Sequence, residues 1–434
     1  MDKKIKKSLR YSLFDGIFAS IMIGASETFI IPYAIAMKAG ARLVGAISAA
    51  PNLAGALLQL GSVSLSDRIG SRKTVTCIAV LIHALMWIPV IAIPYVFKDH
   101  MAVYLLVFYA MLVAIGLVSF PPWSSMMADH VPETERGKVF GRRNRVFGVT
   151  NICSMLLAGL LLHAFRNSPS GAFTGFTIIF TIAFISRVIS WKFLTKMYEP
   201  PLHVKPEHRF TMRAFLKRIR RSNFGRFVMF VATVNFAVYM ASPFFAVYML
   251  RDLHFNYLIY TVVIMTATLT IFLMMKVWGS RADLVGNRRV LRLTSYFIPF
   301  VPILWLFSQN VAYLVAIQVF AGFFWAGFNL SASNFIYDAV TPEKRTRCIA
   351  YYNVINGIAI FSGAMTGGFL AKCLPPIFGS RLLSLFLLSG LLRFAALPIC
   401  STIKEVRQVK HVSSLELFYS IMTARPPTSL YSNR

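Results

Sequence analysis

Glu27 is the carboxylate best placed to do chemistry in this chain, because it stands near the middle of the apolar segment 12–36, in Gly24-Ala-Ser-Glu27-Thr-Phe. An ionised group that deep in an apolar segment is costly. It should therefore face a hydrated cavity or a partner, or take up a proton. This predicts a site that takes up a proton or binds a cationic or neutral ligand. A hydrogen bond to Asn or Ser of a neighbouring helix is the simpler alternative.

Two short polar loops repeat one pattern, in which an Asp is followed three residues later by Gly and then by adjacent basic residues. The first loop holds Asp67, Arg68, Gly70, Arg72 and Lys73, and the second holds Gly279, Asp283, Gly286, Arg288 and Arg289. An Asp at a helix end can face the positive N-terminus of another helix, and the cations can pair with carboxylates. A pair of tight turns with solvated charges is the alternative.

A second charge pattern follows each loop. Asp129 precedes Arg136 by seven residues, and Asp338 precedes Arg345 by the same distance. A conformational charge network and a plain surface ion pair both explain this spacing, and exposed pairs alone contribute little stability.

Three further charges lie inside apolar segments. Asp15 is expected to pair with a basic residue of the cluster Arg142, Arg143 and Arg145. Arg187 and Arg393 stand about two turns from the ends of their segments, where long side chains can extend to a membrane interface. We expect them to act as anchors there.

Uncharged polar and aromatic residues inside the apolar segments are candidates for a hydrated substrate cavity, because buried polar groups need partners in lipid. Bridging between helices is the alternative for each. The candidates are Asn52, Trp123, Asn235, Tyr239, Gln318, Trp325, Asn329 and Asn356.

Enzyme motifs are absent from the sequence. It contains no HExxH, Walker loop, GxSxG or paired-cysteine metal spacing, and its five cysteines show no paired arrangement. We expect no catalytic residues, no metal and no cofactor.

Composition indicates a membrane protein. Of 434 residues, 57% are hydrophobic and 14% are charged, against roughly 25% charged in soluble domains. The net charge of +29 could indicate nucleic acid binding, but the cations are distributed in small groups between apolar segments. Twelve such segments are long enough to span a bilayer: 12–36, 43–65, 74–97, 102–126, 146–165, 171–193, 227–250, 255–277, 290–307, 311–336, 348–371 and 382–401.

Lys and Arg predict the orientation of these segments. One alternate set of connections, which includes both termini and the central segment, holds 36 of the 45 Lys and Arg residues, and the other set holds seven. This bias places both termini and the central loop in the cytoplasm.

The two halves of the chain repeat one another. Asp67 and Asp283 are 216 positions apart, and Asp129 and Asp338 are 209 apart. Arg187 with Glu199, and Arg393 with Glu405, keep a twelve-residue spacing. The sequence therefore predicts an all-α integral membrane protein, with twelve transmembrane helices in two pseudo-symmetric six-helix bundles.

The paired loops resemble the signature loop of the major facilitator superfamily, which joins helices 2 and 3 and recurs between helices 8 and 9. Val63 departs from the pattern, because the family has Gly there. The resemblance implies a substrate site between two parallel halves near mid-membrane. It also implies that Asp67 bonds to helix 11 and Asp283 to helix 5, gating the cytoplasmic side.

Four regions are predicted: an N-terminal bundle 1–194, a cytoplasmic central loop 195–224, a C-terminal bundle 225–403 and a cytoplasmic tail 404–434. In the central loop, apolar residues alternate with Arg213, Lys217, Arg218, Arg220 and Arg221. This pattern favours an amphipathic helix on the inner leaflet, and a solvated linker is the alternative.

These observations favour a secondary transporter that moves a small organic solute by alternating access, with a possible coupling proton. The expected location is a bacterial inner membrane, and the expected partners are the solute and the lipid bilayer, with a monomeric chain and no nucleic acid. A non-transporting sensor or receptor on the same scaffold is one alternative, and an amphiphile or lipid translocase is another.

Overall fold

The computed structural model describes residues 3–131, 136–165, 173–200 and 212–407. Regular structure in this part of the chain is entirely helical, and the only β-type pairing there is an isolated bridge between Ile377 and Ser380. Eleven helical segments among these residues are long and apolar enough to cross a membrane. The prediction of an all-α membrane fold is confirmed.

The remaining expected span, 290–307, is a broken helix. Helix α13 (Asn287–Phe297) is followed by the short helix α14 (Phe300–Leu304). Pro299 and Pro302 explain the break, because proline has no N–H and its ring clashes with the preceding turn.

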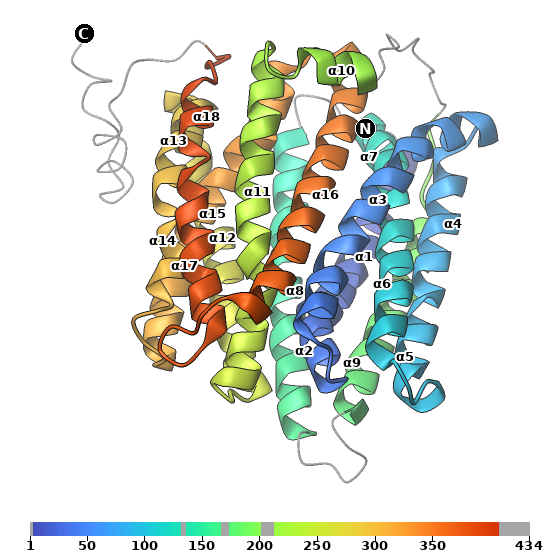
Figure 1. Cartoon of the computed structure of the whole chain (residues 1–434). Helices are drawn as coiled ribbons and strands as arrows, with labels where there is room; N and C mark the ends of the chain where they lie inside the picture. The colour runs from blue at the N-terminus through green and yellow to red at the C-terminus, as the bar shows by residue number, and fades with distance from the viewer. Residues whose placement is uncertain (1–2, 132–135, 166–172, 201–211, 408–434) are drawn as a thin grey trace. The chain divides into compact units, whose positions relative to one another are not determined.

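The chain divides into two compact units. Unit 1 comprises Met1–Pro206 and Pro243–Thr261, and unit 2 comprises Glu207–Ser242 and Val262–Arg434. The C-terminal part of the seventh span and the start of the eighth therefore belong to unit 1. Each unit is a helical bundle (Figure 1).

Unit 1 has α1 packed against α8 and α9, and α3 packed against α6. Its elements are α1 (Lys3–Ser26), η1 (Glu27–Phe29), α2 (Ile30–Ala36), α3 (Ala41–Ile69), α4 (Arg72–Leu85), α5 (Trp87–Val96), α6 (Met101–Val118), α7 (Phe120–His130), α8 (Arg136–Ala164) and α9 (Phe173–Leu194).

Unit 2 has α13 packed against α15, and α14 against α17. Its remaining elements are α10 (Met212–Arg218), α15 (Val311–Ala339), α16 (Pro342–Cys373), α17 (Arg381–Phe394) and α18 (Leu397–Ser401). Three elements cross or adjoin the boundary between the units: α11 (Asn223–Val247), the π-helical turn η2 (Tyr248–Asp252) and α12 (Tyr257–Val285).

A proline leaves the carbonyl four residues earlier without the helical N–H that would donate to it, and a side chain donates in place of that N–H. Pro94 leaves the carbonyl of Val90 four residues earlier, and the Tyr33 hydroxyl donates to that carbonyl over 3.1 Å. Pro302 likewise leaves the carbonyl of Ile298, which accepts from Arg393 over 3.1 Å. Such replacement is required because lipid offers the backbone no hydrogen bonds.

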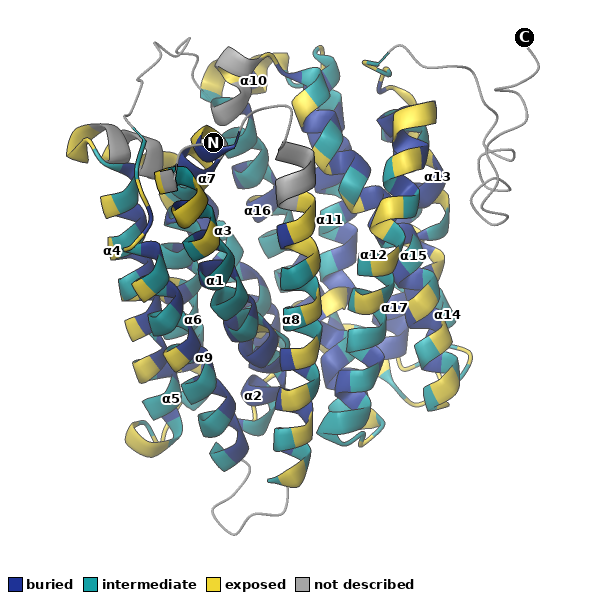
Figure 2. Cartoon of the chain, turned by 180° about the vertical axis from the view of Figure 1, so that it is seen from behind, coloured by how far each residue is buried: buried dark blue, intermediate teal, exposed yellow. Residues whose placement is uncertain are grey.

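Apolar residues on the outside of the units indicate the lipid-facing surface. Along α4 and α5, Ile78, Ile82, Leu85 and Ile88 are between 42% and 51% exposed, and Figure 2 shows exposed residues recurring along α4. Their spacing of three or four residues places them on one face of the helix. The interior of unit 2, in contrast, holds stacked aromatic rings, with the Phe227 centroid 4.6 Å from that of Phe335.

Candidate functional site

Glu27 lies at a break in the first span. Helix α1 ends at Ser26, η1 begins at Glu27, and α2 begins at Ile30. Pro32 explains the break, since it cannot donate to the carbonyl of Thr28. The Tyr260 hydroxyl donates to this carbonyl instead, over 2.9 Å within unit 1. The chain therefore leaves its regular helical path at the residue that carries the carboxylate.

The Glu27 side chain is exposed. It makes no hydrogen bond or ion pair within the described part of the chain. The alternative prediction, a hydrogen bond to Asn or Ser of a neighbouring helix, is therefore not observed there. Its neighbours are engaged locally: Ser26 donates to the carbonyl of Met22 over 2.7 Å, and Phe29 is fully buried. The carboxylate is thus held on an ordered frame and has no partner among the described residues.

Arg72 is the centre of a polar cluster in unit 1. Its guanidinium is 5% exposed and donates to Asp129 over 2.7 Å. It also donates to the Ser125 hydroxyl over 3.0 Å and to the carbonyl of Pro200 over 3.1 Å. Hydrogen bonds that involve a charged partner are the stronger kind. The first signature loop is therefore tied to the end of α7 and to the segment after α9.

Glu199 caps helix α4, which follows this loop. Its carboxylate accepts from the backbone N–H of Arg72 over 2.6 Å and of Lys73 over 3.1 Å. The Ser71 hydroxyl donates to it over 2.6 Å and accepts from the Thr74 N–H over 3.0 Å. A carboxylate suits this place, because the first N–H groups of a helix have no internal partner and its N-terminus is positive.

Unit 2 repeats the cap with Glu405. Its carboxylate accepts from the backbone N–H of Arg288 over 2.8 Å, at the start of α13. Asn287, at the position of Ser71, donates instead to Asp338 over 2.7 Å. The two halves therefore share one architecture with different polar partners.

In unit 2, Arg407 makes the contact with aspartate that Arg72 makes in unit 1. It donates twice to Asp338, over 2.7 Å and 3.1 Å, and once to Asp283 over 3.0 Å. The hydrogen bond to Asp338 is the main reason that the pKa of Arg407 is raised. This arginine comes from the segment after the last span, so that segment is fastened to the second signature loop.

A further pair of equivalent contacts occurs in the two halves. The N–H of Tyr198 donates to the Ser8 hydroxyl over 3.1 Å, and the N–H of Lys404 donates to the Asn223 side chain over 2.7 Å. The first links the segment after α9 to α1, and the second links the segment after α18 to α11. The acidic residue that follows directly in each segment, Glu199 or Glu405, caps α4 or α13 respectively.

The two loop glycines differ in what an added side chain would meet. Both have positive φ, +73° at Gly70 and +89° at Gly286, where ψ is +154°, so alanine would be strained by about 1–3 kcal/mol at either. A Cβ at Gly70 would have open space, whereas at Gly286 it would collide with the Glu405 carboxylate. We expect Gly286→Ala to lower the melting temperature of the purified protein clearly more than Gly70→Ala. Equal effects would contradict the cap at Glu405.

The sequence matches the family model described as Major Facilitator Superfamily over residues 16–275 and 227–417. This chain is a member of the major facilitator superfamily. The resemblance inferred from the two loops is thereby confirmed, and with it the assignment to a family of membrane transporters. No curated protein sequence matches the chain.

Solved structures of superfamily transporters share the fold. A mutant of the nucleoside transporter NupG superimposes with a TM-score of 0.70 at 14% identity, over 90% of this chain and 99% of its own. A bacterial homologue of the human lysosomal transporter Spinster, inward-facing and occupied, gives 0.60 at 14% identity, over 98% of both chains. At these identities the likeness shows the fold alone.

Several predicted residues of this superfamily member have side chains outside the described part of the structure. They are Asp67 of the first loop, Arg136 and Arg345. Arg68 is exposed, and Lys73 takes part through its backbone. The expected partners of Asp129 and Asp338 thus stay untested, while both carboxylates bind the signature-loop clusters described above.

Among the cavity candidates, the structure brings Asn235 and Asn356 together. Asn235 donates to Asn356 over 2.8 Å, and Asn356 donates to the carbonyl of Tyr352 over 3.1 Å. The other candidates in unit 2 do not join this pair by any contact recorded among described residues: Asn329 is exposed, Gln318 is buried, Tyr239 is half-buried, and Trp325 packs edge-on against Phe328. In unit 1, Asn52 donates back to the carbonyl of Ser48 over 3.4 Å.

Trp123 belongs to a buried charged cluster that the sequence only partly predicted. Arg143 lies over its ring, 5.2 Å from the centroid. Ser190 donates to Asp15 over 2.7 Å and accepts from Arg187 over 3.2 Å, and Arg187 also donates to His83 over 3.2 Å. The charge-bearing cluster lies within unit 1, on α1, α4, α8 and α9.

The expectation that Arg187 and Arg393 extend to the membrane interface was wrong. Arg187 turns inward to His83 and Ser190, and Arg393 is 4% exposed and donates to the carbonyl of Ile298. In both cases an internal acceptor holds the guanidinium. For Arg393 the acceptor exists because of Pro302, whose effect on the backbone was not anticipated.

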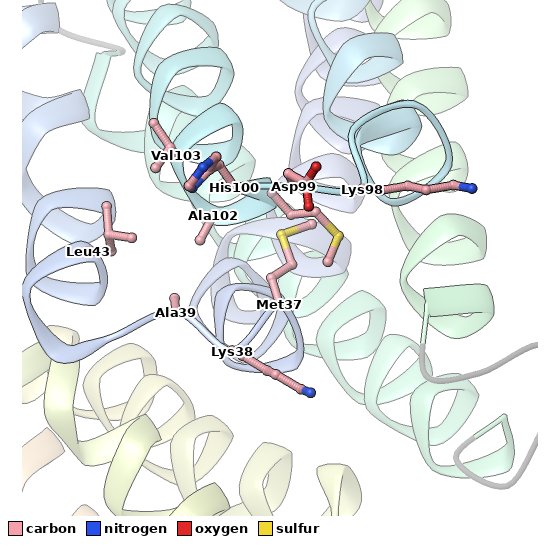
Figure 3. A pocket seen from close by; sticks show the side chains of 10 residues that line it. Met37, Lys38, Ala39, Leu43, Lys98, Asp99, His100, Ala102 and Val103 are labelled. Carbon is pink, nitrogen blue, oxygen red and sulfur yellow. The ribbon is translucent and has the colours of Figure 1, made fainter.

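A pocket of about 280 Å³ lies in unit 1 at the connections between α2 and α3 and between α5 and α6. Figure 3 shows Met37, Ala39, Leu43 and Ala102 around it, with Lys38 and Lys98 directed away. None of the predicted site residues lines it. It is therefore separate from the candidate site at Glu27.

Proposed function

We propose that this superfamily member moves a small organic solute across the membrane by alternating access, with Glu27 as the residue that meets the solute or a coupling proton. The observation that carries the proposal is the exposed Glu27 carboxylate at a break in a membrane-spanning helix. A carboxylate at this depth is expensive to maintain. The free-energy cost of keeping a carboxylate at this depth is explained if Glu27 binds a cation or a proton during transport.

The charge of the proposed site favours a cationic or neutral solute over an anionic one. Glu27 is an acid, and no Lys or Arg lies within ten residues of it along the first span, from Ile17 to Met37. The two arginines inside spans that the sequence singled out, Arg187 and Arg393, are held by internal acceptors. Neither is left to bind a carboxylate or phosphate of a solute.

The signature loops supply the proposed conformational control. We expect Asp67 and Asp283 to bind the opposite half in the state that is closed to the cytoplasm. In unit 2, Asp283 is 71% exposed and already accepts from Arg407. This contact supports coupling between the proposed gate at the second signature loop and the segment after the last span. Both termini are proposed to lie in the cytoplasm of a bacterial cell, with the chain in its inner membrane.

The test is uptake by reconstituted protein. A thermal-shift screen of purified protein should include organic cations, neutral metabolites and nucleosides, because one structural neighbour is a nucleoside transporter. A compound that stabilises the protein should then accumulate in proteoliposomes with saturable kinetics, and accumulation should respond to an imposed pH gradient. Binding without any movement of the compound would contradict transport and favour a sensor.

A further inference from the structure

The basic face is a set of five cations on α10 and on the turn that follows it. Arg213, Lys217, Arg218, Arg220 and Arg221 are all exposed. Their side chains make no hydrogen bond or ion pair with any residue that the structure describes. The neighbouring sequence offers no compensation, since no acidic residue occurs between Glu207 and Asp252. Among the described residues the face therefore carries positive charge that no acidic side chain compensates.

Helix α10 is fixed to unit 2 and presents this face in a defined position. Phe215 is buried in the core of the unit, with ring centroids 6.0 Å from Phe224 and 5.7 Å from Tyr351. The turn after α10 folds back so closely that a Cβ at Gly225 would collide with the carbonyl of Ile219. Arg226 also donates to the carbonyl of Arg221 over 3.3 Å.

The depth of the face follows from the span beside it. The seventh membrane-spanning segment runs over Asn223–Asp252, so the turn at Arg220 and Arg221 lies at its very end. This is the level of lipid headgroups. Leu216 is 49% exposed among the cations, and an apolar side chain next to basic ones is typical of helices that lie in a membrane interface.

We propose that the basic face binds the headgroups of anionic phospholipids in the cytoplasmic leaflet. Positive charge without internal partners, a position at the headgroup level and an exposed leucine that can enter the acyl region all fit this ligand. An acidic protein of the cytoplasm would match the charge but would give no reason for Leu216. The proposal rests on the membrane fold and on the cytoplasmic orientation proposed above, and it needs no assumption about the solute.

Lipid binding can be measured on the full-length protein without a transport assay. Phosphatidylglycerol or phosphatidylcholine is titrated into the detergent-purified chain, and bound lipids are counted by native mass spectrometry. The test variant is Lys217→Gln/Arg218→Gln/Arg221→Gln. The matched control is Lys6→Gln/Arg10→Gln/Arg142→Gln, which removes three exposed cations from unit 1. Because each cation near a membrane surface contributes appreciably, we expect phosphatidylglycerol affinity to fall about 10-fold or more in the test variant only.

Two results would overturn the proposal. One is an equal loss in both triple variants, which would mean that only total charge matters. The other is unchanged phosphatidylglycerol binding by the test variant. Gly225→Ala provides an independent check, because it keeps all five cations and disturbs only the mounting of α10. We expect it to weaken phosphatidylglycerol binding while leaving phosphatidylcholine binding unchanged, and wild-type binding of both lipids would also count against an ordered face.

Discussion

Glu27→Gln is expected to lower solute uptake by reconstituted protein about 10- to 100-fold, the loss that follows from removing one charge-assisted contact of roughly 1.5–3 kcal/mol. The amide keeps the size and hydrogen-bonding capacity of the side chain but can neither carry a negative charge nor take up a proton. Since Glu27 is exposed and its carboxylate has no partner among described residues, the substitution leaves no stranded group inside the protein. We therefore expect expression and melting temperature to stay close to those of the wild type.

The pH gradient separates the two roles proposed for Glu27. If the residue carries the coupling proton, uptake that remains in Glu27→Gln should no longer depend on the gradient. If it binds a cationic group of the solute, the gradient dependence should persist while the affinity for the solute falls. Asp99→Asn, at an exposed carboxylate outside the spans, is the matched control and should behave as wild type. Unchanged uptake with unchanged pH dependence in Glu27→Gln would remove the residue from the mechanism.

Arg72→Gln is expected to destabilise the protein by about 2–3 kcal/mol, because a buried guanidinium and its charge-assisted hydrogen bonds are lost. The shorter glutamine cannot span the distances to Asp129, Ser125 and the carbonyl of Pro200 at once. Asp129 is 45% exposed, so it can regain water, which keeps the cost below that of a fully buried ion pair. The melting temperature of purified protein measures the effect.

Two other arginines calibrate the effect of Arg72→Gln. Arg68 stands in the same loop and is exposed, so Arg68→Gln should leave the melting temperature nearly unchanged. Arg407 bridges two carboxylates but is 33% exposed, so Arg407→Gln should fall between the two. If Arg68→Gln destabilised the protein as much as Arg72→Gln, the buried cluster would not be what holds the first signature loop.

The sequence was sufficient to predict the spans, the duplication and the two loops, because hydrophobic length and turn chemistry are local properties. The glycines Gly70 and Gly286 do adopt positive φ at their turns. The partners of the loops were harder to find. Glu199 and Glu405 were visible as a repeated spacing, but their capping role depends on segments more than 110 residues away in the chain.

Proline effects were also missed, because they depend on tertiary contacts. Pro32 breaks the helix at Glu27 and leaves the carbonyl of Thr28 to accept from Tyr260. Pro302 determines where the Arg393 guanidinium goes. In each case the sequence contains the proline, but it does not reveal which side chain supplies the missing hydrogen bond.

Alternating exposure of the site can be measured without knowing the solute. In a background where Cys77, Cys153, Cys348, Cys373 and Cys400 are replaced by serine, Glu27→Cys provides one thiol at the proposed site. A membrane-impermeant maleimide is applied to right-side-out and to inside-out vesicles, and Ile78→Cys, on the lipid-facing surface, serves as the unlabelled control. We predict that the thiol at position 27 is modified from both faces of the membrane. Modification from one face only, or from neither, would contradict transport by alternating access through this site.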